Sequence, residues 1–275
     1  MNELKQKLGR WGERLAGGIM AGLALLMALF LVLPFVALVW RAVTLEGRLT
    51  AVDVGAIGAA IWLSLLTTAV AMLLLILFGT PLAYLLSRYT FPLKKLLTLF
   101  VELPIVMPPV VAGLALLSAF GRRGLLGQPL VEIWGVTITF TATAVVMAQL
   151  FVSAPFYIRA AQSRFTSLPP AYEDAAAVDG ANSWQIFWLI MLPQSFPALL
   201  NGLILSWARA LGEFGATILF AGNLAGRTQT MPLLVYSALE RDLRATFITA
   251  LILLALAVLA FGLTRWLGGY YNEVT

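Results

Sequence analysis

Long apolar runs dominate this chain, and they constrain its fold more than any other feature. Of the 275 residues, 61% are hydrophobic and only 11% are charged, whereas a soluble chain of this length needs far more charge to cover its surface. Several runs exceed the roughly 20 apolar residues that cross a bilayer. We therefore predict an all-α polytopic membrane protein that forms a single transmembrane domain, residues 1–275. The six expected spans lie at about residues 16–40, 59–87, 96–120, 136–158, 196–222 and 245–267.

Glycines and prolines inside two of the runs predict departures from a straight helix. Residues 79–81, Gly-Thr-Pro, predict a kink or break in the second run. The third run contains Pro104, Pro108 and Pro109. Prolines remove backbone donors, which a bilayer tolerates where neighbouring helices or water satisfy the freed groups. These prolines are therefore consistent with a packing kink or with the lining of a pathway.

The chain contains no cysteine and no histidine, and this excludes several classes of function. Disulfides, thiol catalysis and cysteine metal sites are impossible. The commonest metal ligand and general base is also missing. We expect no catalytic residue, metal ion or cofactor in this chain, and a membrane enzyme would have only carboxylate chemistry available. The net charge of +5 is better explained by basic loops facing the cytoplasm than by nucleic-acid binding.

One polar stretch, residues 166–193, interrupts the apolar sequence between the fourth and fifth spans. Two prolines at 169–170 suit a helix start, with Thr166 or Ser167 as possible caps. Acidic residues follow in the first turn, where the helix dipole favours negative charge. Gly180 is placed to end this helix, and Asn182 or Ser183 to cap a second helix that runs from Trp184 towards Pro193.

This stretch resembles the cytoplasmic loop of ABC importer permeases, whose pattern is E-A-A, three residues, G, nine residues, I, one residue, L-P. Every interval matches, and the one departure is Asp174, where the family usually has Glu. The resemblance implies the type I ABC importer permease fold, in which this loop forms a coupling helix that docks into a groove on the ATPase subunit. An amphipathic helix lying on the membrane surface is the alternative. The resemblance implies ATPase-coupling roles for Glu173, Asp174, Ala175, Ala176, Asp179, Gly180, Ile190, Leu192 and Pro193.

The basic residues predict which side of the membrane this loop faces. Six spans would place both termini and the 166–193 loop on one side, together with ten Lys or Arg residues, against seven on the other side. Both termini are therefore expected to be cytoplasmic, in the inner membrane of a prokaryote, with the loop within reach of an ATPase. The N-terminal members of this basic group are Lys5, Lys7, Arg10 and Arg14.

Charged side chains within or near the spans need partners. Glu102, Arg209 and Glu213 would each cost about 2.5–3.5 kcal/mol at a helix centre if they faced lipid. Arg209 and Glu213 are four residues apart and share a helix face, so a local ion pair is one interpretation. The other is that they help to build the gate or line the path between two permease copies.

The sequence around this pair carries a second resemblance. Arg209-Ala-Leu-Gly-Glu-Phe-Gly-Ala-Thr217 is similar to the fifth-span signature of oxyanion permeases, the molybdate, tungstate and sulfate importers. Residues 221–224 and 227–233 resemble the molybdate-type loop that follows, and residues 103–113 fit the third-span pattern. The resemblance covers roughly residues 59–260. The pathway or gate candidates are Glu102, Pro104, Pro108, Pro109, Arg209, Gly212, Glu213, Phe214 and Gly215.

The spans offer few polar side chains, which favours a conduit over a tight anion pocket. A tetrahedral dianion held strongly needs several converging donors, whereas a pathway needs weak interactions that release the ion. Selection would then fall to an external binding protein, as in the family. The chain has no G-x-x-x-x-G-K-[ST] sequence, so ATP and Mg²⁺ are expected on a partner.

Together these features predict the membrane subunit of an ABC importer for an oxyanion, with molybdate or tungstate as the first candidate. The expected partners are a second copy of the chain, two ATPase subunits, an extracytoplasmic binding protein and membrane lipid. The binding protein is expected at residues 41–58, 121–135 and 223–244. A sulfate or thiosulfate permease is the first alternative, and it would more often pair with a different permease chain. An ion-coupled secondary transporter is the second, although we find no internal repeat of the kind such proteins carry.

Overall fold

The computed structural model describes the backbone of residues 2–46 and 50–274, and side chains for residues 17–46, 50, 53–259 and 262. Within these residues the secondary structure is entirely helical, which confirms the expected all-α class. The chain divides into two units, Met1–Arg48 and Leu49–Thr275. The N-terminal basic side chains and Arg265 lie outside the side chains described.

The first unit contains one long helix, α1, Asn2–Thr44, which includes the expected first span. Its segment Gly17–Thr44 is apolar all round, with a mean hydropathy of 2.8 over its most apolar stretch. The side chains of that stretch are exposed within the unit. A helix of this kind needs lipid or another protein around it.

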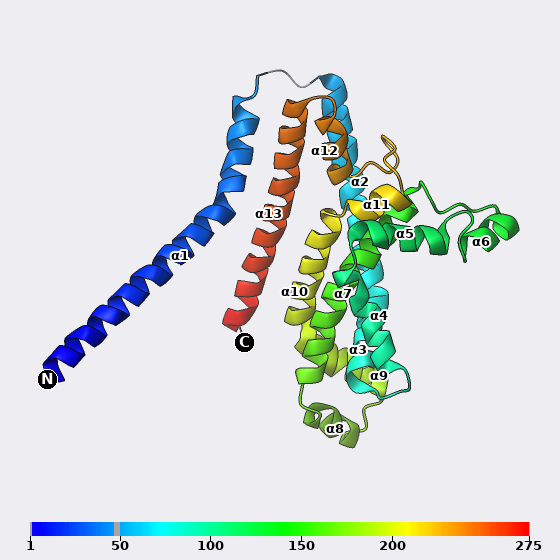
Figure 1. Cartoon of the computed structure of the whole chain (residues 1–275). Helices are drawn as coiled ribbons and strands as arrows, with labels where there is room; N and C mark the ends of the chain where they lie inside the picture. Colours follow the sequence, from blue (N-terminus) through cyan, green and yellow to red (C-terminus); the bar gives the residue numbers. More distant parts are fainter. Residues whose placement is uncertain (1, 47–49, 275) are drawn as a thin grey trace. The chain divides into compact units, whose positions relative to one another are not determined.

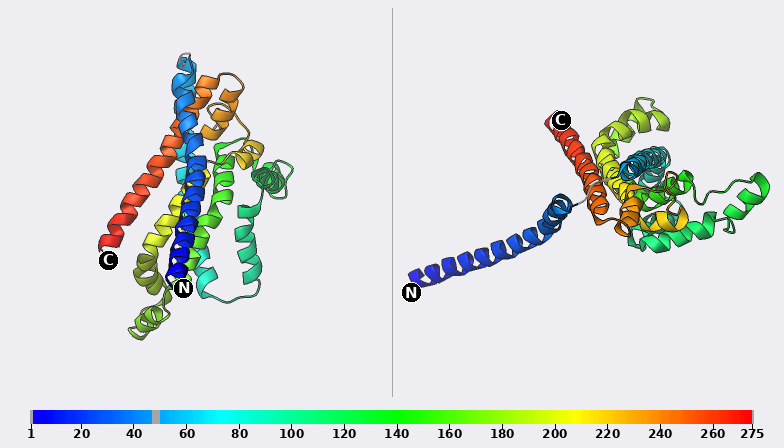
Figure 2. Two further views of the ribbon diagram at one scale, coloured as in Figure 1. Left: turned by 60° about the vertical axis from the view of Figure 1, so that its left-hand side comes forward. Right: turned by 90° about the horizontal axis from the view of Figure 1, so that it is seen from above.

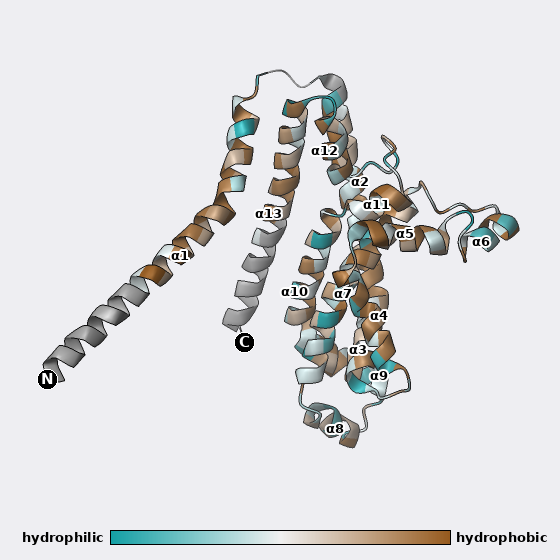
Figure 3. Cartoon of the chain, viewed as in Figure 1, coloured by the Kyte–Doolittle hydropathy of each residue, from teal (hydrophilic) through white to brown (hydrophobic). Residues whose placement is uncertain are grey.

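The second unit contains the remaining helices, which Figures 1 and 2 show from three directions. Figure 3 shows the hydrophobic colour along its long helices, whereas α6 carries hydrophilic residues. The helices are α2 Ala51–Leu74, η1 Leu75–Gly79, α3 Thr80–Arg88, α4 Lys94–Val106, α5 Pro109–Phe120, α6 Gly127–Trp134, α7 Ala142–Ser167, α8 Ala171–Val178, α9 Ser183–Ile186, η2 Phe187–Met191, α10 Leu192–Leu211, α11 Gly215–Phe220, α12 Met231–Leu239 and α13 Leu243–Val274.

Helix α7 forms the centre of this unit and packs against α2, α3, α4, α10 and α11. Its contact with α10 is close, because a Cβ added at Gly202 would lie 2.7 Å from the Cβ of Ala160. Ser206 of α10 donates a 3.0 Å hydrogen bond to the Ser153 carbonyl of α7. Figure 1 shows α7 and α10 side by side, both leading towards the end where α8 lies. These two helices flank the α8–α9 segment in the chain and connect it to the centre of the unit.

The expected kink in the second run is a π-helical turn, η1, inside one continuous helical segment from Ala51 to Arg88. Pro81 follows this turn by two residues. A second π turn, η2, precedes Pro193 by the same spacing. Proline cannot donate to the residue four positions back, and a π turn changes the hydrogen-bond register just before it. Glycine and proline at 79–81 thus mark a local irregularity, as expected, although the helix does not stop there.

The third and fifth runs are each divided into two helices. The third run breaks at Met107 and Pro108, where both residues have extended backbone and α5 then crosses the direction of α4 (Figure 1). The fifth run breaks at residues 212–214, between α10 and α11. The break at residues 107–108 agrees with the departure from a straight helix that the prolines of the third run predict, whereas the break at residues 212–214 was not expected.

All three segments expected as loops contain helical residues, and one expected loop helix is longer than predicted. Residues 41–58 include the end of α1 and the start of α2, residues 121–135 include α6, and residues 223–244 include α12. The helix that begins at Ser183 does not end at Pro193, because it continues through η2 and α10 to Leu211. Among the residues whose side chains are described, the helices long and apolar enough to cross a membrane are Gly17–Thr44, Asp53–Arg88, Ala142–Ser167 and Ser183–Leu211, with shorter apolar helices at Pro109–Phe120 and Leu243–Leu259.

Candidate functional site

The polar stretch between the fourth and fifth spans forms a helical knuckle, α8 and α9, at one end of the second unit (Figure 1). Glu173 and Asp174 lie in the first turn of α8, as expected. The expected caps were wrong. Thr166 and Ser167 belong to α7, where their hydroxyls donate to the carbonyls of Gln162 and Arg164. These bonds satisfy both hydroxyls locally, and Pro170 occupies the cap position of α8 instead.

The turn between α8 and α9 follows the expected chemistry. Asp179 caps α8, and Gly180 has a φ of +89°. The Gly180 N–H donates to the Ala177 carbonyl at 3.1 Å and the Ala181 N–H to the Ala176 carbonyl at 2.9 Å, which is the Schellman pattern. A glycine is favoured here because side chains with a Cβ are strained at positive φ.

The second helix of the knuckle begins at a capping box. The Asn182 side chain accepts from the Gln185 N–H at 2.9 Å, and the Gln185 side chain accepts from the Asn182 N–H at 2.9 Å. Asn182, one of the two caps predicted, is thus the cap used. The two motifs fix the direction of the chain between α8 and α9 from local interactions alone.

Every residue of α8 is described, and none is buried. Ala175 and Ala177 are exposed, and large apolar side chains beside them are exposed as well: Val178 to 87%, Trp184 to 69% and Leu189 to 72%. Ala176 and Ala181 instead pack against the core beneath. Of the other coupling candidates, Asp179 and Pro193 are exposed, and Ile190 and Leu192 are partly buried. The knuckle therefore presents a backbone with small side chains on its outer face.

Arg88, at the end of α3, ties the knuckle to the second span. Its Nε lies 2.8 Å from Glu173 Oε1, and its Nη2 donates to the Leu168 carbonyl at 2.9 Å. The two side chains are only 15% and 25% exposed. The sequence places Arg88 in a short basic loop with Lys94 and Lys95, and nothing in the spacing distinguishes it from them. Arg88 thus joins the knuckle to the end of the second span.

Two further contacts hold the base of the knuckle. Arg164 of α7 donates through Nε and Nη2 to the Gln194 carbonyl, at 3.2 and 2.9 Å. The ring of Tyr84 packs edge-on against Phe165 and Phe187, with centroids 5.5 and 4.9 Å apart. These contacts join α3, α7, η2 and the start of α10 into one packed group at the end of the unit that carries α8.

The ion pair expected between Arg209 and Glu213 is present. Arg209 Nη1 lies 2.7 Å from Glu213 Oε2, and Glu213 is 1% exposed. Glu213 Oε1 also accepts from the Ala216 N–H at 2.8 Å, so the carboxylate holds the first turn of α11. Gly212 and Phe214 form the break around it, and the Phe214 ring packs near Tyr236. The pair stabilises the connection between α10 and α11.

The third-run and fifth-run motifs meet in space, although about a hundred residues separate them. A Cβ added at Gly215 would lie 2.6 Å from the Cβ of Pro109, and one added at Gly113 would lie 2.9 Å from the Cβ of Leu219. Helices α5 and α11 therefore pack with their backbones in close contact. Sequence spacing gave no indication of this contact.

Replacing Gly215 with alanine should destabilise the protein by about 1–3 kcal/mol, because the new methyl group would overpack the contact with Pro109. Gly212→Ala is the matched control, since its Cβ would meet its nearest atom, the Ala208 carbonyl oxygen, at 3.7 Å. Thermal unfolding in detergent measures both. Equal midpoints for the two variants would contradict the close packing of α5 and α11.

Replacing Glu213 with glutamine should cost about 3 kcal/mol or slightly less, because Arg209 would be left without its carboxylate partner in a largely buried site. The matched control is Glu102→Gln. Glu102 pairs with Arg159 at 3.5 Å, and these side chains are 40% and 58% exposed. A pair so exposed is worth less than about 1 kcal/mol. Similar losses of stability in both variants would show that burial does not distinguish the two pairs.

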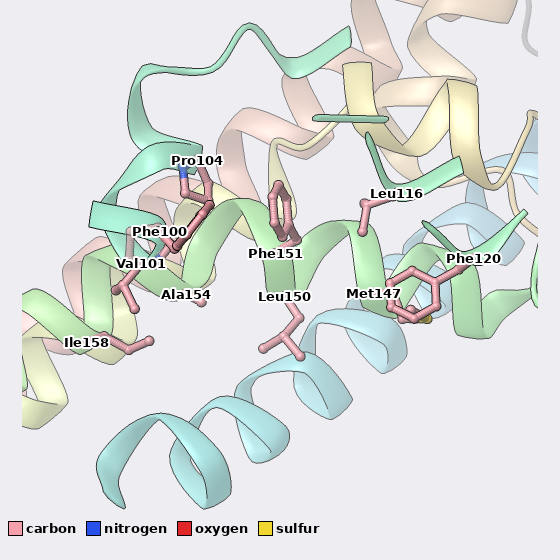
Figure 4. A pocket seen from close by; sticks show the side chains of 11 residues that line it. Phe100, Val101, Pro104, Leu116, Phe120, Met147, Leu150, Phe151, Ala154 and Ile158 are labelled. Carbon is pink, nitrogen blue, oxygen red and sulfur yellow. The ribbon is translucent and has the colours of Figure 1, made fainter. Parts of the chain in front are cut away.

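The other pathway candidates lie around α4 and the α4–α5 break. Pro104 is buried and lines an apolar pocket of about 310 Å³ between α4, α5 and α7. Figure 4 shows this pocket with Phe100 and Pro104 on one side, Leu116 and Phe120 on another and Phe151 between them. Pro108 and Pro109 are exposed. The apolar lining offers an anion no donor, so this pocket is unsuited to hold the cargo.

A polar cluster that the sequence did not predict fixes the loop before α12. Gln229 donates to the Asn223 side chain at 2.9 Å, and Asn223 donates to the Ser237 hydroxyl at 2.7 Å. Thr228 accepts from the Leu224 N–H at 3.0 Å. The loop between α11 and α12 therefore has a defined shape, which suits a docking surface.

Comparison with known proteins identifies the family. The model of the binding-protein-dependent transport system inner membrane component matches residues 76–269. The chain belongs to this family. It is 38% identical to the molybdenum transport system permease protein ModB of Escherichia coli K12 over 216 residues, which are 78% of this chain and 94% of ModB. It is 39% identical to the sulfate transport system permease protein CysT of the same organism over 202 residues, 73% of each chain.

The fold is also found among solved structures. A chain of a bacterial ABC transporter involved in the import of alginate superposes with a TM-score of 0.68 and 18% identity, covering 91% of this chain and 95% of that chain. This confirms the type I importer permease fold expected from the coupling-loop resemblance. As a family member with several long apolar helices, the chain is a multi-pass membrane subunit.

Proposed function

We propose that this chain is the permease subunit of an ABC importer that moves an oxyanion, molybdate or tungstate, from an extracytoplasmic binding protein to the cytoplasm. The observation that carries the proposal is the exposed knuckle formed by α8 and α9. Its small residues leave room for another protein to approach the backbone, and Arg88 joins it to the core of the unit. Family membership and the similarity to ModB over 94% of that protein support the import of a molybdenum anion.

In the proposed complex, two copies of the chain enclose the pathway and two ATPase subunits bind their cytoplasmic knuckles. ATP and Mg²⁺ belong to those subunits. Both termini are cytoplasmic, and the binding protein docks on the opposite side, on residues 41–58 and on the loops that contain α6 and α12. The candidate docking charges there are Arg122, Arg123, Arg227, Arg241 and Arg244. The ordered cluster around Asn223 and Gln229 supports this use of the second loop.

The charges near the pathway suit passage rather than storage. The Arg209 guanidinium is neutralised by Glu213 at 2.7 Å, so it offers an anion little net attraction. A tight intramembrane site would retain the ion, whereas transport needs weak contacts that release it. Selectivity is therefore assigned to the binding protein.

Reconstitution in vesicles with the cognate ATPase and binding protein tests the proposal. Binding protein loaded with molybdate or tungstate should raise ATP turnover and drive uptake of the anion, and sulfate-loaded protein should do so far less. Uptake that runs on a proton or sodium gradient without ATP would instead identify a secondary transporter.

The similarity to CysT favours one second candidate, a sulfate permease. Purification of the tagged complex separates the two. A second, non-identical permease chain in the complex would exclude the proposed homodimer, and stimulation by sulfate in preference to molybdate would assign the sulfate function.

A further inference from the structure

A stripe of polar side chains runs along the facing sides of α4 and α7. On α7 it comprises Arg159, Gln162, Ser163 and Thr166, at the i, i+3, i+4, i+7 spacing of one helix face. On α4 it comprises Thr98 and Glu102, one turn apart. Together with Ser167, these residues line a cavity of about 370 Å³. The two helices thus present one continuous polar surface.

The two charged members of this surface, Glu102 and Arg159, are set further back along their helices than its hydroxyls. Glu102 is eight residues from Lys94, the first residue of α4, and Arg159 is eight residues from Ser167, the last residue of α7. At 1.5 Å per residue, each charge is about 12 Å from the end of its helix. Charged side chains at such depth avoid lipid and face protein or a water-filled cavity.

The end of the helices at which the cavity opens is the end that carries the knuckle. Thr166 and Ser167 are the last residues of α7, and only Leu168, Pro169 and Pro170 separate Ser167 from the start of α8. In the proposed orientation this is the cytoplasmic side. An ion that leaves the pathway towards the cytoplasm would therefore pass near this surface.

The chemistry of the cavity suits an oxyanion held weakly. A guanidinium, an amide and several hydroxyls can donate to the oxygens of a tetrahedral anion. Glu102 lies 3.5 Å from Arg159, and both side chains are substantially exposed. The buried Arg209–Glu213 pair is closer, at 2.7 Å. Arg159 is therefore accessible to a competing anion in a way that Arg209 is not.

We infer that this surface is a transient release site for the oxyanion. The anion and the Glu102 carboxylate compete for the Arg159 guanidinium. The inference rests on the proposed import function. Glu102 acts as a tethered competitor that keeps the affinity low, and Arg159, Gln162 and Ser163 supply the donors. Removing the competitor should strengthen anion binding, and removing the guanidinium should abolish it.

Because the chain contains no native cysteine, a single cysteine at Ser163 reports directly on this cavity. The assembled complex in vesicles, without nucleotide, is treated with an anionic and a cationic methanethiosulfonate reagent. The ratio of anionic to cationic reaction rates should be highest with Glu102→Gln, intermediate in the parent and lowest with Arg159→Met. Each step should be severalfold, as expected for one charge in a hydrated site at about 5–6 Å, the Cβ spacing of residues such as Arg159 and Ser163 that lie four apart on a helix. Molybdate should slow the reaction most with Glu102→Gln and not at all with Arg159→Met.

Thr90→Cys, at an exposed position in the loop before α4, is the matched control: Glu102 lies about 12 Å along α4 beyond Lys94, more than a Debye length away, so its rate ratio should not change with either substitution. Equal ratios at Ser163→Cys in all three backgrounds, no reaction there, or no protection by molybdate with Glu102→Gln would each overturn the release site. Molybdate uptake by the parent complex is measured in the same vesicles. If uptake fails while the labelling order holds, the anion site stands and the import function is wrong.

Discussion

Arg88→Met should reduce the coupling ratio, which is the amount of anion taken up per ATP hydrolysed, by at least about tenfold, while the complex with the ATPase still assembles. The substitution removes both the 2.8 Å ion pair with Glu173 and the hydrogen bond to the Leu168 carbonyl. Hydrogen bonds to charged groups contribute about 1.5–3 kcal/mol, which corresponds to roughly a 10- to 100-fold change in an equilibrium. Loss of this link leaves α8 free to move without moving α3. Uptake per ATP hydrolysed is the measurement.

Lys95→Met is the matched control for this prediction. Lys95 belongs to the same basic segment as Arg88 in the sequence, but its side chain is exposed at the start of α4. Its removal should leave the coupling ratio unchanged. Glu173→Gln should lower the ratio by less than Arg88→Met, since the bond to Leu168 survives. If Arg88→Met and Lys95→Met transported equally well, α3 would have no part in transmission.

Gly180→Val should also uncouple ATP hydrolysis from uptake. At a φ of +89°, a side chain with a Cβ costs about 1–2 kcal/mol, and a branched one is among the worst. The space around Gly180 is open, so the penalty comes from the backbone and not from a clash. The Schellman turn would open, and the last turn of α8 would lose its fixed position. Gly180→Pro should have a still larger effect, because proline cannot adopt positive φ.

Gly180→Asn tests whether this position requires a residue that tolerates positive φ or requires glycine specifically. Asparagine tolerates the left-handed conformation, so this variant should retain most of its uptake. Membrane insertion, checked by expression level and thermal stability, should be the same in all three variants. Full uptake with Gly180→Pro would contradict a mechanical role for the turn.

The features that could be predicted from sequence are those set by neighbours along the chain. Gly180 and Asn182 act within one turn of their own positions, and Arg209 meets Glu213 four residues away on one helix. The polar knuckle, the helical class and the irregularity near Pro81 are of the same kind. In each case a local rule of helix geometry decides the outcome.

The features that could not be predicted depend on tertiary packing. Arg88 and Glu173 are 85 residues apart, and only the fold brings them together. The contact of Gly215 with Pro109 has the same origin. The continuous helix through Pro193 was missed because proline is a local stop signal, and the π turn that accommodates it leaves no clear mark in the sequence. Thr166 was misassigned because a hydroxyl can cap the next helix or bond back within its own.

The central claim is that the knuckle faces the cytoplasm and receives another protein's nucleotide-driven movement. A single cysteine at Val178, which is 87% exposed beside the small-residue face, tests this most directly in a chain without native cysteines. A membrane-impermeant thiol reagent should label Val178→Cys only from the cytoplasmic side, and bound ATPase should protect it. Labelling from the opposite side, or labelling that the ATPase leaves unchanged, would contradict the account.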